Sequence, residues 1–363
     1  MSLREQIDEE RHKISAIDRQ ILQLISERLT VAQRIGQLKK KENLPIRDYS
    51  IEQKVLKRNI ETAKQLDIST EMTKKLVDLL INEAVLIQEK HENFVSEVKS
   101  GKKVLIIGGL GKMGSWLAEF FRSSGYEVDI LDSSDSHPKL TDNDLPKIIN
   151  NYQFIAISTP LKSLISILHD IVNLKPQGTI FEIGSLKSHI LSEIKCGIDQ
   201  GLKITSLHPM FGPNIRTLNG RNVILASSGS KEADASVKQL FDQTACNMVE
   251  IPIEDHDKYM SISLGLSHAI NLLFGMVVTK TKLGQKIDNF ASTTFLKQLR
   301  TTKEVFSENP ELYYSIQKLN YYKDSLYLDL VKSVADLKSL IDSDNPKDFT
   351  TFMQKSMDFF KEL

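Results

Sequence analysis

A glycine-rich turn gives the sequence its clearest chemical signal. The string Gly109–Gly114 follows the apolar run Val104–Ile107 and opens a stretch with helical spacing at residues 113–122. In such a strand–turn–helix unit the glycines allow a tight turn, close approach of a pyrophosphate and packing of the helix on the strand, while the helix N-terminus faces the phosphates. Gly109 is expected at the tight turn. The residues that would hold a dinucleotide are Gly109, Gly111, Lys112, Met113 and Gly114.

An acidic residue stands where such a turn needs one. Residues 126–131 are expected to form the next strand, which ends at Asp132, about 20 residues beyond the turn. A carboxylate there accepts hydrogen bonds from the ribose hydroxyls and favours NAD over NADP. The whole unit therefore predicts an NAD site, whereas the glycine string alone would be weak evidence because glycine turns are common.

Two histidines lie where a substrate could meet this cofactor. His208 ends a predicted strand, and ligands of open α/β sheets bind beyond the carboxyl ends of the strands. Ser185 and Lys187 follow the preceding strand and could reach the same crevice. His268 lies on a predicted helix, residues 264–278, that has an apolar face. Imidazole suits a general base at neutral pH, but a lone histidine is more often structural, so both interpretations stay open here.

Cations on an apolar stripe form a third group. Arg11, Arg28 and Lys39 share one face of a predicted helix with five isoleucines. An unpaired buried cation is costly, so three of them on such a face call for anionic partners. A dimeric coiled coil whose long side chains reach solvent is the simpler alternative. The stripe consists of Ile7, Arg11, Ile14, Asp18, Ile21, Ile25, Arg28, Ala32, Ile35 and Lys39.

The elements that must position these groups fall into three domains. Residues 1–92 have apolar residues at helical spacing and predict helices at 7–41, 50–65 and about 70–91, with a break at 43–45 and a linker at 93–102. Residues 103–254 alternate short apolar runs with helical stretches, which predicts a doubly wound α/β domain of the Rossmann class. Helical spacing returns in residues 255–363, so the fold class is all-α, then α/β, then all-α. The runs expected to be strands are 104–107, 154–158, 179–183, 204–207 and 223–226.

The composition excludes several classes of function. Lys plus Arg equals Asp plus Glu, at 47 each, so no bulk charge exists to hold nucleic acid or an acidic membrane surface. We expect neither a signal peptide nor a membrane-spanning run, and therefore a cytoplasmic protein. The two cysteines, Cys196 and Cys246, stand far apart, and no cluster has metal-ligand spacing, so we expect no metal.

A long helix, a break with Pro45–Asp48 and two shorter helices resemble the all-helical chorismate mutase family over residues 4–90. The resemblance implies an active site in which Arg11 reaches across an interlocked dimer, Arg11 and Arg28 hold carboxylates, and Lys39 and Gln88 hydrogen-bond the ether oxygen. A Claisen rearrangement needs only such binding and electrostatic stabilisation. Asp48 and Glu52 would also line the pocket. The sequence departs from the family pattern at Ile51, where an Arg is frequent, and at Ala84, where a small hydroxyl residue is frequent.

The glycine unit, the Gly-Ser-x-Lys element at 184–187, the string Leu207–Pro213 and Glu254–Asp257 followed by His268 resemble the prephenate dehydrogenase family over about residues 103–325. The resemblance implies that His208 accepts the ring-hydroxyl proton while hydride passes to NAD, that Ser185 supports His208, and that His268 and Lys187 contact the substrate. An Arg of the family pattern is replaced by Glu304, so we assign a substrate carboxylate to Arg300 instead.

The two resemblances support each other, because the product of the first reaction is the substrate of the second. Together they imply a bifunctional enzyme of tyrosine biosynthesis that binds chorismate and prephenate. An unpartnered apolar stripe further predicts a homodimer, and tyrosine is a candidate feedback inhibitor. Two alternatives remain: another NAD-dependent hydroxyacid or imine dehydrogenase with a helical dimerisation arm, and an inactive regulatory protein that binds NAD or tyrosine.

Overall fold

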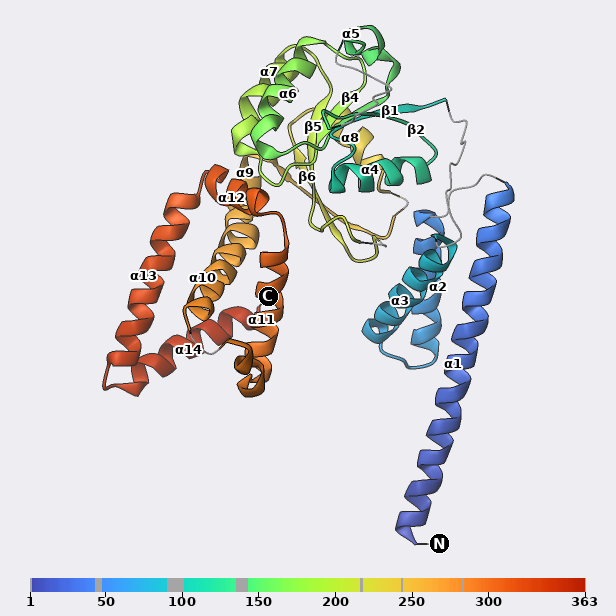
Figure 1. Ribbon diagram of the computed structural model, residues 1–363, viewed down its shortest axis with the longest axis vertical. Coiled ribbons are helices and arrows are strands. Elements are labelled where there is room, and N and C mark those ends of the chain that lie inside the picture. The colour runs from blue at the N-terminus through green and yellow to red at the C-terminus, as the bar shows by residue number, and fades with distance from the viewer. Residues whose placement is uncertain are drawn as a thin grey trace. The chain divides into compact units, whose positions relative to one another are not determined.

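The computed structural model describes residues 2–42, 48–89, 101–134, 143–215, 218–242, 244–281 and 284–362. They form two compact units, Met1–Gly184 with Ser192–Ile253, and Ser185–Leu191 with Glu254–Leu363 (Figure 1). The predicted helix break at 43–45 and most of the predicted linker at 93–102 lie outside the described residues.

Three helices form the N-terminal part of the first unit: α1 (Leu3–Lys41), α2 (Tyr49–Gln65) and α3 (Thr70–Glu89). Helices α1 and α2 both pack against α3. The contact between α2 and α3 is built on a small cluster of buried apolar side chains, Leu56, Val77, Ile81 and Val85. Asp48 caps α2, because its side chain accepts the N–H of Ile51 at 3.1 Å. The three helices predicted from apolar spacing are confirmed.

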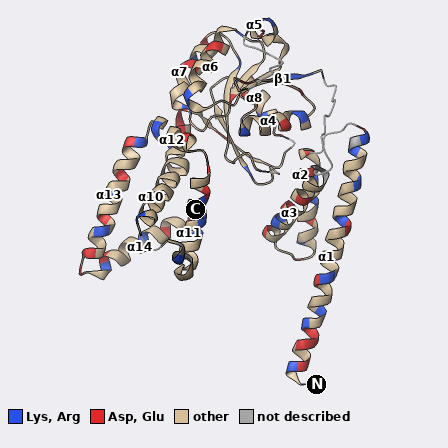
Figure 2. Cartoon of the chain, viewed as in Figure 1, with Lys and Arg blue, Asp and Glu red and all other residues tan. Residues whose placement is uncertain are grey.

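The first half of α1 is not covered by any of the described residues. Every residue from Ser2 to Leu24 is exposed, over roughly 35 Å of helix. Figure 2 shows that positive and negative residues alternate along this helix, and Arg11 pairs with Asp8 three residues away at 3.1 Å. Three isoleucines of the stripe, Ile7, Ile14 and Ile21, are also exposed. A helix with an uncovered apolar stripe of this length is expected to pair with another surface.

The remainder of the first unit is built on a seven-stranded sheet in the order β2-β1-β3-β4-β5-β6-β7. The strands are β1 (Lys103–Ile107), β2 (Glu127–Leu131), β3 (Phe154–Ile157), β4 (Thr179–Glu182), β5 (Ile204–Pro209), β6 (Asn222–Ser227) and β7 (Asn247–Pro252). The predicted apolar runs all form strands. Strand β7 was not predicted, because it is a half-exposed edge strand with no continuous apolar run. Strand β6 runs antiparallel to β5, a direction that periodicity in the sequence does not encode.

Helices between the strands bury their apolar faces on the sheet. They are α4 (Lys112–Ser123), α5 (Leu145–Ile148), α6 (Leu161–Asn173), α7 (Leu191–Asp199) and α8 (Lys231–Gln239). Trp116, Phe120 and Phe121 of α4 are buried in one core cluster with Phe154 of β3 and Phe181 of β4. This packing fixes α4, and with it the glycine turn from which the helix starts.

The C-terminal unit is helical, as predicted. It comprises α9 (Ile253–Met260), a π-helical turn (Ser261–Leu266), α10 (Ser267–Lys280), a 3-10 helix (Gly284–Phe290), α11 (Thr293–Ser307), α12 (Pro310–Leu319), α13 (Lys323–Asp342) and α14 (Pro346–Lys361). Segment Ser185–Leu191, which the sequence placed in the α/β domain, belongs to this unit.

The stretch Ile253–Lys280 is long and apolar enough to cross a membrane by length and composition, so the expectation that no run in this chain has that character is wrong. Its polar groups nevertheless bond to neighbouring helices of the same unit. The Asn271 side-chain oxygen accepts hydrogen bonds from Gln298 at 3.0 Å and from Thr302 at 2.9 Å, and the Gly265 carbonyl accepts one from Gln317 at 3.0 Å. These contacts are typical of a helix inside a protein bundle.

Candidate active sites

A cavity of about 740 Å³ lies at the carboxyl ends of the first three strands. Its lining includes Gly108 and Gly111 from the turn after β1, Asp132 after β2, and Ser158 and Thr159 after β3. The chain passes from β1 outward to β2 and then back across to β3, so the strand order reverses here. Dinucleotides bind in α/β sheets at such a switch point.

The structural roles of the glycines in this turn differ in part from the sequence prediction. The residue with the left-handed backbone is Gly108, with φ of +80°, and not Gly109. Gly109 must lack a side chain because a Cβ would lie 2.7 Å from Ile130. At Gly114 a Cβ would meet the Gly108 carbonyl oxygen at 2.1 Å, so this glycine permits helix α4 to pack on the turn, as predicted. Gly111 is the N-cap of α4, and a Cβ there would meet only the Gly108 carbonyl oxygen, at 3.4 Å, so the rest of this side is free for the approach of a pyrophosphate.

Asp132 organises the mouth of this cavity. One carboxylate oxygen accepts the N–H of Leu110 at 2.9 Å, and the other accepts the N–H of Ser134 at 2.9 Å and its hydroxyl at 2.6 Å. Partial burial would raise the pKa of Asp132, but these hydrogen bonds outweigh it and hold the pKa below its usual value. The group is thus a carboxylate, and the oxygen that accepts Leu110 keeps an acceptor position for a ribose hydroxyl.

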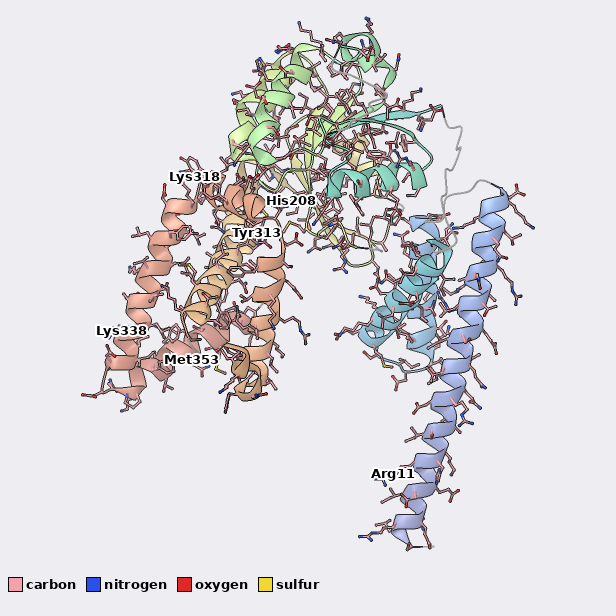
Figure 3. All side chains as sticks on the ribbon, viewed as in Figure 1. Arg11, His208, Tyr313, Lys318, Lys338 and Met353 are labelled. Atoms are coloured by element: carbon pink, nitrogen blue, oxygen red, sulfur yellow. The ribbon has the colours of Figure 1, made fainter. Side chains whose placement is uncertain are left out.

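His208 lies near the end of β5, buried and paired across the ladder with Ile224 of β6 (Figure 3). Two residues earlier, Ser206 donates its hydroxyl to Glu182 at the end of β4. The second oxygen of Glu182 accepts the N–H of Gly184 at 2.6 Å. A fully buried carboxylate therefore ties the ends of β4 and β5 together, and sequence reasoning missed it although the acid ends an otherwise apolar strand.

The C-terminal unit holds the other predicted dehydrogenase residues. Lys187 is fully buried, and Arg300 of α11 is exposed, as is Glu304 one turn later. His268 of α10 is half-buried, and its ring centre lies 4.4 Å from that of Tyr313. Burial lowers the pKa of His268, so its imidazole is neutral at neutral pH. A neutral ring offers a hydrogen bond without a charge, which suits contact with a substrate that already carries its own anions.

Helices α1 and α2 bring several predicted mutase residues together. Burial lowers the pKa of Lys39, and the nearby carboxylates of Asp48 and Glu52 act in the opposite direction. Arg28 donates to the Leu80 carbonyl of α3 at 2.7 Å, and burial together with the charge of Arg58 lowers its pKa. These cations are thus partly removed from water, the condition under which they bind anions strongly.

Of the other two predicted mutase residues, Arg11 lies apart from this group, on the exposed half of α1 (Figure 3) and roughly 25 Å along the helix from Arg28. Gln88 lies in the last turn of α3, and its side chain is outside the described residues. Within the described part of the chain, no group of three or more His, Cys, Asp or Glu could hold a metal ion.

Comparisons with known families match the three domains in order. Residues 10–89 match chorismate mutase type II, residues 124–250 the nucleotide-binding domain of prephenate dehydrogenase, and residues 252–355 its dimerization domain. The chain belongs to the chorismate mutase–prephenate dehydrogenase family. It is a bifunctional enzyme of tyrosine biosynthesis, an isomerase joined to an NAD-dependent oxidoreductase.

Individual relatives agree with this assignment. The T-protein of Haemophilus influenzae is 24% identical over 321 residues, which cover 87% of this chain and 82% of the relative. The T-protein of Enterobacter agglomerans is 22% identical and covers 84% of this chain and 80% of its own length. Prephenate dehydrogenase from A. aeolicus, solved with hydroxyphenyl propionate and NAD+, shares the fold with a TM-score of 0.57 at 18% identity, over 72% of this chain and 98% of that chain.

Substitution of two glycines of the nucleotide site should have different effects, one on stability and the other on cofactor binding. Gly114→Ala forces a Cβ against the Gly108 carbonyl, so we expect a destabilisation of roughly 1–3 kcal/mol. Gly111→Ala has room for its Cβ, so we expect a normally stable protein with at least about tenfold weaker NADH binding, because the methyl group displaces the pyrophosphate. Thermal unfolding measures the first effect, and energy transfer from Trp116, the one tryptophan of the chain, measures the second. Normal NADH affinity in Gly111→Ala would contradict this placement of the cofactor.

The choice of nicotinamide cofactor should depend on Asp132. We expect Asp132→Ser to lower kcat/KM with NAD by about tenfold or more, because hydrogen bonds to a charged acceptor are lost, and to raise kcat/KM with NADP. Initial rates with both cofactors at saturating prephenate measure the ratio. An unchanged ratio would show that another residue reads the ribose.

Proposed function

We propose that chorismate is rearranged to prephenate in the helical N-terminal domain, with Arg28 and Lys39 of α1 as the central cations. Their partial burial beside α2 and α3 is the observation that supports this. Arg28 would hold a carboxylate of chorismate, and Lys39, with Gln88 of α3, would hydrogen-bond the ether oxygen as its bond breaks. Asp48 and Glu52 lie close enough to Lys39 to orient it. No proton has to be transferred, so fixed charges suffice.

The second reaction is assigned to the nucleotide-binding and C-terminal domains. His208 would accept the proton of the ring hydroxyl at C4 of prephenate, with Ser185 supporting the imidazole. NAD supplies the hydride acceptor when it is bound. Loss of the C1 carboxylate as carbon dioxide then makes the ring aromatic, and the oxygen regains a proton to give 4-hydroxyphenylpyruvate. His268, Lys187 and Arg300 would contact the substrate, with Arg300 taking the carboxylate for which Glu304 is unsuited.

The fit of the nucleotide cavity supports NAD as the oxidant. The glycine at position 111 with a single neighbour near its missing Cβ, the N-terminus of α4 that it caps and the ionised Asp132 match a pyrophosphate and a ribose with free hydroxyls. A ribose that carried an additional phosphate would meet the charge of Asp132. Turnover of prephenate with this cofactor would exclude a catalytically inactive regulatory protein.

We further propose a homodimer in which the exposed half of α1 covers a second copy. The uncovered stripe of isoleucines supports this, as does the match of residues 252–355 to a dimerization domain. Arg11, on the uncovered part of α1, would then complete the mutase site of the partner subunit. We also propose a cytoplasmic location and feedback inhibition by tyrosine, because the chain is an enzyme of tyrosine biosynthesis.

A coupled assay separates the two active sites. Wild-type protein with chorismate and NAD should form NADH. Arg28→Ala should lower this rate on the order of 100-fold but leave turnover of added prephenate intact, because it removes charge only from the mutase site. His208→Asn should lower both rates by about 10²- to 10⁴-fold, because a general base is lost. Absence of NADH from either substrate in the wild type would favour the regulatory alternative.

Complementation between variants tests the shared mutase site. Arg11→Ala and Arg28→Ala should each lack mutase activity, but their mixture should recover about one quarter of the wild-type activity. Random pairing makes about half of the dimers mixed, and each mixed dimer has one intact site of two. Co-expression followed by a chorismate consumption assay measures this. No recovery in demonstrably mixed dimers would mean that Arg11 serves its own subunit.

A further inference from the structure

The segment that carries Ser185 and Lys187 does not belong with the strands on either side of it. Residues Ser185–Leu191 come directly after β4 and the turn at Gly184, yet they form part of the C-terminal unit together with residues 254–363. Leu186, Lys187 and Ile190 of this segment are fully buried, so its backbone N–H groups need acceptors from the protein.

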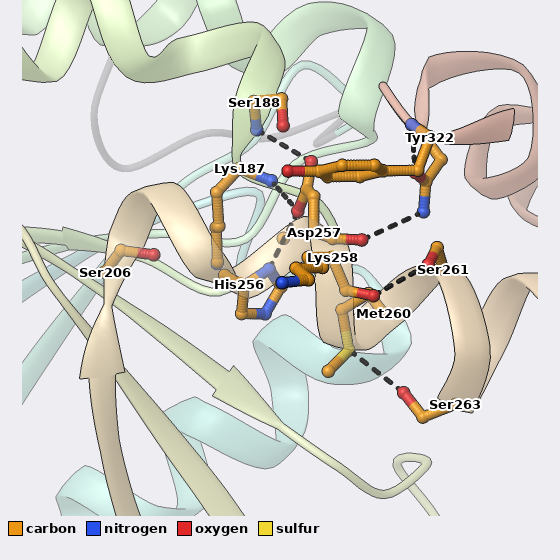
Figure 4. Close-up of polar contacts among 12 residues, drawn as sticks. Lys187, Ser188, Ser206, His256, Asp257, Lys258, Met260, Ser261, Ser263 and Tyr322 are labelled. Atoms are coloured by element: carbon orange, nitrogen blue, oxygen red, sulfur yellow. Dashed lines mark hydrogen bonds and ion pairs between the residues drawn. The ribbon is translucent and has the colours of Figure 1, made fainter. Parts of the chain in front are cut away.

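Asp257 of α9 provides that contact. One carboxylate oxygen accepts the N–H of Lys187 and the other accepts the N–H of Ser188, each at 2.8 Å (Figure 4). The two donors are successive N–H groups at the start of the 3-10 helix Ser188–Ile190. A single carboxylate thus caps this short helix from another part of the chain, where its orphan N–H groups need acceptors.

Asp257 is itself held firmly. The Nδ1 atom of His256 lies 2.8 Å from an Asp257 carboxylate oxygen, and the Asp257 carbonyl accepts a hydrogen bond from Asn320 at 3.5 Å. Asn320 in turn accepts the N–H of Tyr322 at 2.8 Å. The exposed fractions of His256, Asp257 and Asn320 are 0%, 1% and 2%, so water does not compete for these bonds.

We propose that Asp257 is a positioning residue of the dehydrogenase, which holds segment 185–191 so that Ser185 is placed for the reaction. This inference rests on the role proposed above for Ser185. A carboxylate suits the task because both of its oxygens accept N–H groups. An asparagine in its place would turn an NH2 group toward one of the two donors and leave that donor without an acceptor.

The charge of this carboxylate is constant over the working range of pH. Burial alone would raise the pKa of Asp257, but hydrogen bonds from His256, Ser188 and Lys187 hold the pKa at about 2. Its contribution to stability is present above the unfolded pKa of 3.8 and is lost as pH falls from there toward 2. The contact therefore adds no ionisation to the pH–rate profile near neutrality, where a histidine base titrates.

Asp257→Asn tests the inference against Asp255→Asn, a matched change at an exposed acid on the same helix. With prephenate and NAD, Asp257→Asn should lower kcat by about ten- to a hundredfold, because one N–H donor of the segment is left unpaired. Mutase activity, NADH affinity read from Trp116 and the pKa values of the pH–rate profile should stay unchanged. Hydrogen exchange of peptide 185–191 should be faster. Asp255→Asn should match the wild type in every measurement.

A double-mutant cycle with Ser185→Ala distinguishes positioning from a general structural role. If Asp257 acts through Ser185, Asp257→Asn should cost little in the Ser185→Ala background, so the two losses should not multiply. Fully multiplicative losses, or a wild-type kcat in Asp257→Asn, would overturn the inference. Failure of wild type and Asp255→Asn to oxidise prephenate would instead refute the proposed function.

Asp257→Glu covers the case in which Asp257→Asn does not fold. It keeps the charge but moves the carboxylate by one methylene, so we expect a lower kcat with intact mutase activity. Wild-type kcat in Asp257→Glu would overturn the inference. Loss of mutase and dehydrogenase activity together in both variants would also overturn it, because Asp257 would then hold the fold and not the segment.

Discussion

A carboxylate that is removed from water needs hydrogen-bond donors, and the dehydrogenase half of this protein is organised by three carboxylates, the partly buried Asp132 and the buried Glu182 and Asp257, that each accept backbone N–H groups. Asp132 accepts an N–H group of the turn after β1 and one of its own turn after β2. Glu182 accepts an N–H group of the turn after β4, and Asp257 accepts two N–H groups of segment 185–191. In each case the donors belong to a turn that carries proposed cofactor or substrate residues. The same hydrogen bonds that stabilise these charges therefore give the irregular backbone a single conformation.

In the mutase domain the protein supplies cations, because the proposed ligands carry the negative charge. Its fold places half-buried cations on an apolar helix face. Two acids close to Lys39 raise its pKa and so oppose the effect of burial. Helix α1 cannot cover its own apolar stripe, so its exposed half is expected to pack against another surface. The cost of that exposed apolar face is the physical argument for a second copy of the chain.

Much of this arrangement could be predicted from the sequence, since helical spacing, buried strands and the glycine turn are local patterns. The three N-terminal helices, the helical character of the C-terminal part and the runs that became β1 to β6 were found in this way. Strand β7 and the antiparallel direction of β6 were not, because edge strands lack a continuous apolar run and direction depends on pairing. Gly108 was missed since backbone angles are not visible in a motif. Glu182 and Asp257 were missed because their partners include backbone N–H groups, which the sequence does not distinguish. The apolar stretch Ile253–Lys280, which has the length of a membrane span, was overlooked because charged and polar residues at its start and within it interrupt the apolar run.

The central claim is that one chain carries chorismate through to 4-hydroxyphenylpyruvate. Proton NMR of a single sample that contains the wild-type protein, chorismate and NAD tests it most directly, because substrate, intermediate and product have distinct ring signals. The account predicts that chorismate is consumed and that 4-hydroxyphenylpyruvate and NADH appear in equal amounts. Accumulation of prephenate without NADH would contradict the dehydrogenase, and unchanged chorismate beside active oxidation of added prephenate would contradict the mutase.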